Sequence, residues 1–146
     1  MLPQYLITTP QFSRRATWEG RVGRNVPRLV LLDANALLMP FQFRIHLEAE
    51  LRRLLGDVDI AVPSPVIGEL QILAERDRTA RAALRLAGKY RTIEAPGSAD
   101  DALLDLGQAQ GAAVVTLDQP LQDRLRAAGV PRISLRSRNH LAIEGL

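Results

Sequence analysis

The segment LVLLD at residues 29–33 places an acidic residue directly after a short, fully apolar run. The segment VVTLD at residues 114–118 repeats that arrangement late in the chain. Between and after these segments, short apolar runs alternate with amphipathic stretches, which is typical of βαβ units. Strands are expected at 29–33, 58–62, 90–94, 112–117 and 132–136. Helices are expected at about 42–55, after a break at Pro40, and at 64–75, 79–88, 98–111 and 119–128.

This alternation, with right-handed crossovers, predicts an α/β fold: a three-layer α/β/α sandwich around a central, mostly parallel, five-stranded sheet of order 3-2-1-4-5. Residues 28–146 would form that domain, and residues 1–27 a separate arm with a short strand near Tyr5. The final stretch, 137–146, gives no clear prediction.

Four acidic residues would meet at one edge of this sheet. Asp33 and Asp118 end the two strands at which the strand order reverses, where open α/β sheets bind ligands. Glu69 and Asp101 lie early in the helices that begin at the same edge. Taken singly, each acid has a structural explanation, such as a helix cap for the aspartates or a solvated helix edge for the glutamate. Together they would repel one another unless a divalent cation lay between them.

The chemistry that fits these acids is metal-assisted phosphodiester hydrolysis with Mg²⁺ or Mn²⁺, both of which prefer oxygen ligands. Asn35, Thr116 and Asp100 are supporting candidates close to the acids in sequence. Other α/β chemistries lack their motifs. No glycine-rich dinucleotide fingerprint follows the first strand and no P-loop is present. The only lysine, Lys89, precedes the third strand rather than following one, which argues against phosphoaspartate transfer.

Composition favours a soluble cytoplasmic protein without a membrane segment, because 47% of the 146 residues are hydrophobic, 24% are charged and none is cysteine. The arm holds four arginines and one acidic residue, Glu19, for a net charge of +3. Residues 28–146 hold 15 basic and 15 acidic side chains, so the formal net charge of +3 for the whole chain comes from the arm. The arm either contacts the phosphates of a nucleic acid or only aids solubility. Candidate RNA-binding residues are Arg14, Arg15, Arg21, Arg24, Arg136 and Arg138.

The segments LVLLDANALLMPFQF, VPSPVIGELQIL, SADDALLDLGQAQGAAVVTLDQPL and GVPRISLRSRNH resemble the PIN-domain ribonucleases in order and spacing. The resemblance covers about 28–140 and implies that Asp33, Glu69, Asp101 and Asp118 bind Mg²⁺ or Mn²⁺ in an endoribonuclease. Asp101 is preferred to Asp100 because it directly precedes Ala-Leu-Leu, as in the family pattern.

The carboxyl-terminal stretch is more similar to the ribosomal-RNA-processing branch of that family than to its toxin branch. The resemblance therefore implies ribosomal or other structured RNA as substrate and a ribosome-assembly protein as partner. The alternatives are the toxin of a toxin–antitoxin pair, with an antitoxin as partner, and a catalytically silent RNA-binding scaffold. A homodimer through the apolar helices of 64–88 is expected by analogy.

Overall fold

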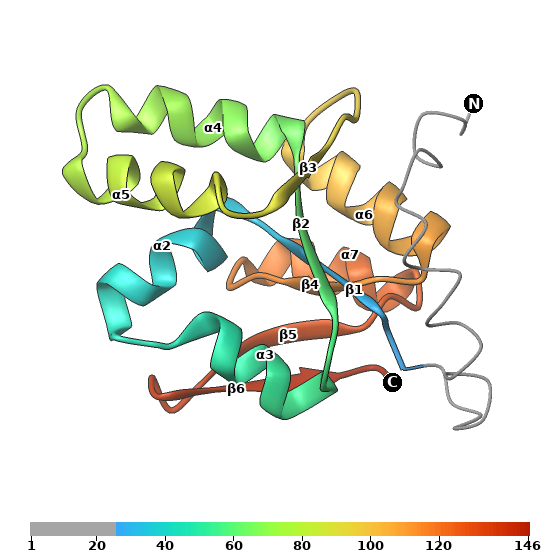
Figure 1. Cartoon of the computed structure of the whole chain (residues 1–146). Helices are drawn as coiled ribbons and strands as arrows, with labels where there is room; N and C mark the ends of the chain where they lie inside the picture. Colours follow the sequence, from blue (N-terminus) through green and yellow to red (C-terminus); the bar gives the residue numbers. More distant parts are fainter. Residues whose placement is uncertain (1–25) are drawn as a thin grey trace.

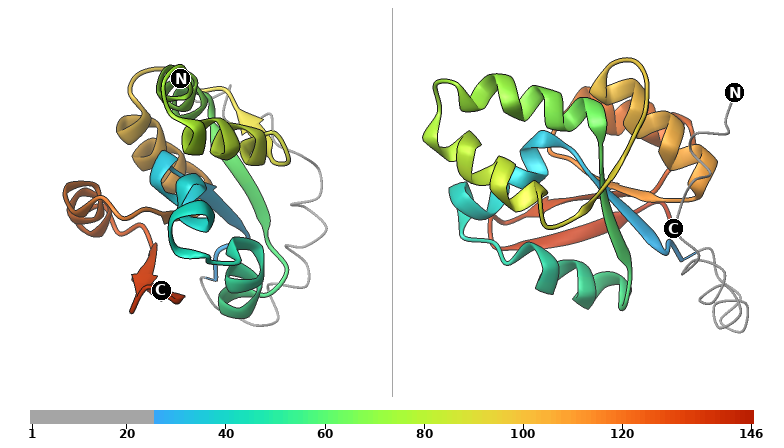
Figure 2. Two further views of the ribbon diagram at one scale, coloured as in Figure 1. Left: turned by 90° about the vertical axis from the view of Figure 1, so that its left-hand side faces the viewer. Right: turned by 45° about the horizontal axis from the view of Figure 1, so that its top comes forward.

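The computed structural model describes residues 26–146 as an open sheet with helices on both faces (Figures 1 and 2). The strands are β1 (Leu29–Leu32), β2 (Asp59–Pro63), β3 (Arg91–Ile93), β4 (Ala113–Val115), β5 (Arg132–Arg136) and β6 (His140–Glu144). The helices are α2 (Ala34–Phe43), α3 (Leu47–Leu55), α4 (Ser64–Ala74), α5 (Arg78–Ala87), α6 (Ala99–Gln110) and α7 (Gln119–Ala127). The arm predicted for 1–27 and its strand near Tyr5 fall almost entirely outside the described residues.

The sheet has the order β3-β2-β1-β4-β5-β6, which confirms the predicted order for the first five strands. All pairs from β3 to β5 are parallel, whereas β6 runs antiparallel to β5. Helices α2 and α3 cover one face and α6 and α7 the other, while α4 and α5 pack against each other beside α2 (Figure 2). The strand order reverses between β1 and β4, so the carboxyl ends of these two strands lie next to each other.

The prediction of a helix beginning after Pro40 is wrong. Helix α2 begins directly after Asp33, contains Pro40 and ends at Phe43, and the next residue, Arg44, has a left-handed φ of 57°. Proline removes one helical hydrogen bond, but α2 buries Ala36, Leu37 and Met39 completely in the core. Burial of this apolar face therefore outweighs the cost of the proline. The single helix expected over 42–55 is instead interrupted at residues 44–46, between the end of α2 and the beginning of α3.

The stretch 137–146 contains the strand β6, which pairs with β5 to form a β-hairpin. Residues Arg132 to Arg136 pair with Glu144 to His140, and the chain turns through Ser137 and Arg138, which both have positive φ. The added strand β6 extends the sheet past β5, whose outer edge would otherwise be open to solvent.

The core lies on both faces of β1 and β4, whose residues are all buried. On one face, α6 approaches the chain after α7 so closely that a Cβ on Gly107 would lie 2.8 Å from Cγ1 of Val130. Val130 is itself buried and β-branched, so its side chain has little freedom to move away. Gly107 is therefore required by packing rather than by backbone conformation.

We expect Gly107→Ala to lower the free energy of unfolding by about 1–3 kcal/mol, because the added methyl group overpacks a filled core. The matched control is Gly68→Ala in α4, where an added Cβ meets nothing within 4 Å. That change should stabilise the protein by about 0.5–1 kcal/mol through helix propensity. Urea unfolding followed by circular dichroism measures both changes. A Gly107→Ala variant as stable as the wild type would contradict this account of the packing.

Candidate active site

Asp33 is a buried carboxylate at the junction of β1 and α2. Its side chain is only 6% exposed, and its Oδ1 accepts a hydrogen bond of 2.7 Å from the backbone N–H of Ala36, which caps α2. Burial raises the pKa of Asp33 from 3.8 to about 7, opposed by hydrogen bonds from Thr116 and Ala36 and assisted by the charges of Asp100 and Asp118. The structure thus holds this group where a negative charge is unfavourable unless a cation accompanies it.

Thr116 joins Asp33 to Asp118. Its side chain is completely buried directly after β4, and its hydroxyl donates to the Asp33 carboxylate. The same oxygen accepts a hydrogen bond of 3.0 Å from the backbone N–H of Asp118. The sequence predicts Thr116 only as a supporting candidate close to the acids. In the structure this hydroxyl fixes the ends of β1 and β4 relative to each other.

Asp118 begins α7, where its Oδ1 accepts a hydrogen bond of 3.1 Å from the N–H of Leu121. Glu69 is exposed on α4, yet partial burial and the charges of Asp100 and Asp118 raise its pKa. Asp100, in the first turn of α6, has its pKa raised by burial and by Asp118. Charges on four elements thus act on one another at the carboxyl edge of the sheet.

Asp101 differs from its neighbour Asp100. Its carboxylate forms an ion pair of 2.9 Å with Arg124 of α7, and this contact holds the pKa of Asp101 below its usual value. The charge of Asp100 raises the pKa of Asp33 and the pKa of Glu69, whereas the charge of Asp101 contributes to neither. The residues brought together are therefore Asp33, Glu69, Asp100 and Asp118. The sequence pattern favours Asp101, but it gives no sign of the contact with Arg124, which lies 23 residues away in the chain.

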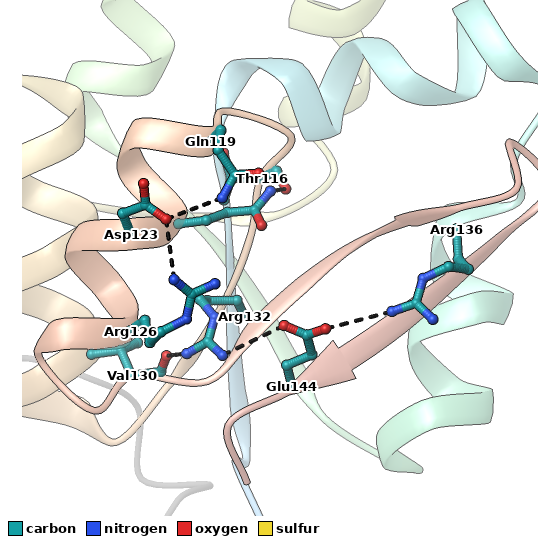
Figure 3. A network of polar contacts seen from close by, with 9 residues as sticks. Thr116, Gln119, Asp123, Arg126, Val130, Arg132, Arg136 and Glu144 are labelled. Carbon is teal, nitrogen blue, oxygen red and sulfur yellow. Dashed lines mark hydrogen bonds and ion pairs between the residues drawn. The ribbon is translucent and has the colours of Figure 1, made fainter.

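The remaining candidates are placed as follows. Asn35 is exposed in the first turn of α2. Arg136 lies 3.6 Å from Glu144, which also pairs with the buried Arg132 at 3.6 Å (Figure 3). Arg138 is exposed at the turn of the hairpin. The candidates Arg14, Arg15, Arg21 and Arg24 lie outside the described residues.

The four acids fit a divalent cation by their chemistry, although not as a preformed cage. Their ligand atoms are all carboxylate oxygens, which suit Mg²⁺ and Mn²⁺. Within residues 26–146, no three His, Cys, Asp or Glu side chains lie close enough to hold an ion together. Mg²⁺ commonly takes only one or two carboxylates and keeps several waters, so a pair of these acids suffices.

The family described as "PIN like domain" matches residues 30–138, which include all four acids. The chain belongs to this family. A solved structure described as that of the PIN domain endonuclease Utp24 is similar to this PIN-like domain with a TM-score of 0.70 and 26% identity. The similarity covers 82% of this chain and 93% of that one. No curated protein sequence matches the chain.

Two further predictions concern surfaces away from the acids. Ile72 and Leu73 of α4 are exposed in the stretch where the sequence predicts a dimer contact, and that contact stays a prediction. In the part of the chain that the structure describes, no helix is long and apolar enough to cross a membrane.

Burial of Asp33 predicts a pH dependence of stability for the metal-free protein. The pKa of this carboxyl is raised to about 7 in the folded state, so that state holds the proton more tightly than the unfolded chain does. Its contribution to stability is therefore lost as the pH rises from about 4 to about 7. Asp33→Asn keeps an oxygen that can cap α2 and removes the titration. The variant should be more stable than the wild type at pH 8 by about 2–4 kcal/mol, and much less so at pH 4.

Urea unfolding at the two pH values in the presence of EDTA measures this difference. Asp101→Asn is the matched control, because that carboxylate is exposed and paired with Arg124. The control should not gain stability at pH 8. An Asp33→Asn variant with the same pH dependence as the wild type would show that burial does not disfavour the charge.

Proposed function

We propose that this PIN-like domain is a metal-dependent endoribonuclease that hydrolyses RNA phosphodiester bonds with Mg²⁺ or Mn²⁺. The observation that carries the proposal is the gathering of carboxylates at the carboxyl edge of the sheet, where the charges of Asp100 and Asp118 both raise the pKa of Asp33 and the pKa of Glu69. A protein that served only as a scaffold would gain nothing from a buried carboxylate with a pKa near 7. Family membership and the similarity to a PIN domain endonuclease support nuclease chemistry.

Asp33 and Asp118 are the residues proposed to hold the ion, with Asp100 and Glu69 close by. Bound there, the ion would lower the pKa of water and offset the negative charge of the phosphate in the transition state. Thr116 and the N–H of Ala36 hold the Asp33 carboxylate in one orientation. Glu69 is more exposed and its pKa is raised, which suits it to accept a proton from the attacking water.

Ribosomal or another structured RNA is the proposed substrate class. This rests on the similarity of the carboxyl-terminal stretch GVPRISLRSRNH to the RNA-processing branch of the family. The toxin branch of the family shares the same core and is the alternative. A toxin should arrest growth when it is expressed without an inhibitory partner, whereas a processing enzyme should be tolerated.

RNA cleavage tests both the activity and the choice between adjacent acids. With Mg²⁺ or Mn²⁺ present, Asp33→Asn, Asp118→Asn and Asp100→Asn should each reduce the cleavage rate by at least about 100-fold, equivalent to about 3 kcal/mol of transition-state stabilisation. Asp101→Asn is the matched control and should stay within about three-fold of the wild type, because Asp101 is held by Arg124. EDTA should abolish cleavage by the wild type.

Cleavage rates of a labelled RNA under single-turnover conditions provide the measurement. If Asp33→Asn and Asp118→Asn both cut as fast as the wild type, the proposed site is wrong. If Asp101→Asn loses activity and Asp100→Asn does not, the active site uses Asp101 rather than Asp100.

A further inference from the structure

The turn between β5 and β6 has a conformation that its residues adopt only at a cost. Ser137 and Arg138 have φ of 57° and 64°, and the N–H of Asn139 donates to the carbonyl of Arg136 at 3.4 Å. Two consecutive left-handed residues are typical of a type I′ turn, where glycine and asparagine are preferred. A serine and an arginine occupy these positions instead. Backbone strain of this kind is commonly retained where the side chain has a use.

The strand on the outer side of this turn is fastened to the body of the protein. Glu50 of α3 accepts a hydrogen bond of 2.8 Å from the N–H of Leu141, and Arg53 donates one of 2.7 Å to the carbonyl of Leu141. Glu50 and Arg53 also pair with each other at 2.9 Å. These side chains satisfy backbone groups of β6 that face away from β5. The free edge of the hairpin is therefore bonded to α3 at Leu141.

The charges along the hairpin are not equivalent. Glu144 lies between Arg132 and Arg136, at 3.6 Å from each, and offsets their positive charge (Figure 3). Arg138 is exposed, and within residues 26–146 it makes no ion pair. It is thus the cation of this hairpin that remains available to a ligand.

The turn extends past the edge of the sheet at which the acids lie. Strands β4 and β5 are parallel, with Val115 beside Ile133, and Thr116 and Asp118 follow directly after β4. Strand β5 continues to Arg136, three residues beyond Ile133, which is about 10 Å of extended chain. Arg138 therefore lies beyond the carboxyl end of β5, at the same edge of the sheet as the acids.

We propose that Arg138 is a phosphate-binding residue that holds the RNA strand beyond the cleavage site. A guanidinium group can donate two parallel hydrogen bonds to one phosphate, and the fixed hairpin presents it without a large loss of freedom on binding. Arg136 instead keeps its place beside Glu144 and stabilises the hairpin. This inference rests on the proposed function, because it takes RNA to be the substrate that crosses the acidic edge.

Binding of a labelled single-stranded RNA in EDTA, followed by fluorescence anisotropy over a series of salt concentrations, tests the inference without cleavage. Arg138→Gln should weaken binding by about three- to ten-fold at low salt and reduce the slope of log K against log salt by about 0.7. Arg138→Lys should retain most of the binding. Arg52→Gln is the matched control, because Arg52 is an exposed arginine in the last turn of α3, shortly before the amino end of β2 and thus away from the carboxyl ends of the strands. It should bind RNA like the wild type.

Arg138→Gly separates the role of the side chain from that of the fold. Glycine adopts a left-handed conformation without strain, so this variant should melt at the same temperature as the wild type or higher, yet bind RNA as weakly as Arg138→Gln. If Arg138→Gln binds RNA with the affinity and salt dependence of Arg52→Gln, the inference is overturned. Cleavage by the wild type would in that case leave the proposed function standing. If no cleavage occurs with either metal, the proposed function fails. Weaker RNA binding by Arg138→Gln would in that case still show that Arg138 binds phosphate.

Discussion

Placing the carboxylate of Asp33 inside the protein is the constraint on which the rest of this edge of the sheet depends. Apolar strands bury the end of β1, and the first turn of α2 buries it further, so the charge loses its contact with water. The hydroxyl of Thr116 and the N–H of Ala36 recover only part of that loss, since the pKa of Asp33 remains well above its usual value. The same two donors fix the carboxylate in one position. A group that is costly to ionise and tightly oriented suits a ligand more than it suits stability.

The topology brings the other acids to this group. Reversal of the strand order between β1 and β4 puts Thr116 and Asp118 beside Asp33, and α4 and α6 begin at the same edge. Asp118 is tied to Thr116 through its own backbone N–H, so its position follows from that of β4. Glu69 and Asp100 depend instead on how α4 and α6 pack, and they are more exposed. The edge thus combines two acids held by the sheet with two acids held by helices.

The sequence is sufficient to predict what depends on local pattern and chain direction. Five strands, their order, and the positions of Asp33 and Asp118 at strand ends all follow from apolar runs joined by crossovers. The beginning of α2 does not, because the cost of Pro40 is local whereas the gain from burying Leu37 and Met39 comes from the assembled core. The choice between Asp100 and Asp101 is also not local. Adjacent residues of a helix differ by about 100° in direction, and which of the two turns toward Asp118 depends on packing and on the contact of Asp101 with Arg124. The roles of these acids in catalysis stay predictions.

An acidic edge that cuts RNA must also attract a polyanion, and the charges of the domain show how difficult that is. Residues 28–146 carry 15 basic and 15 acidic side chains, so no overall field draws RNA to this part of the chain. Without a bound cation, Asp33, Glu69, Asp100 and Asp118 would repel the phosphates on either side of the cleaved bond. Attraction must then come from cations that lie outside the group of acids. These cations must also be held by rigid structure, because otherwise they would pair with the carboxylates. Arg124 lies too close to meet that requirement, because Asp101 already holds it. The hairpin of β5 and β6 meets it, since Glu50 and Arg53 fasten its free edge and Arg138 projects from its turn.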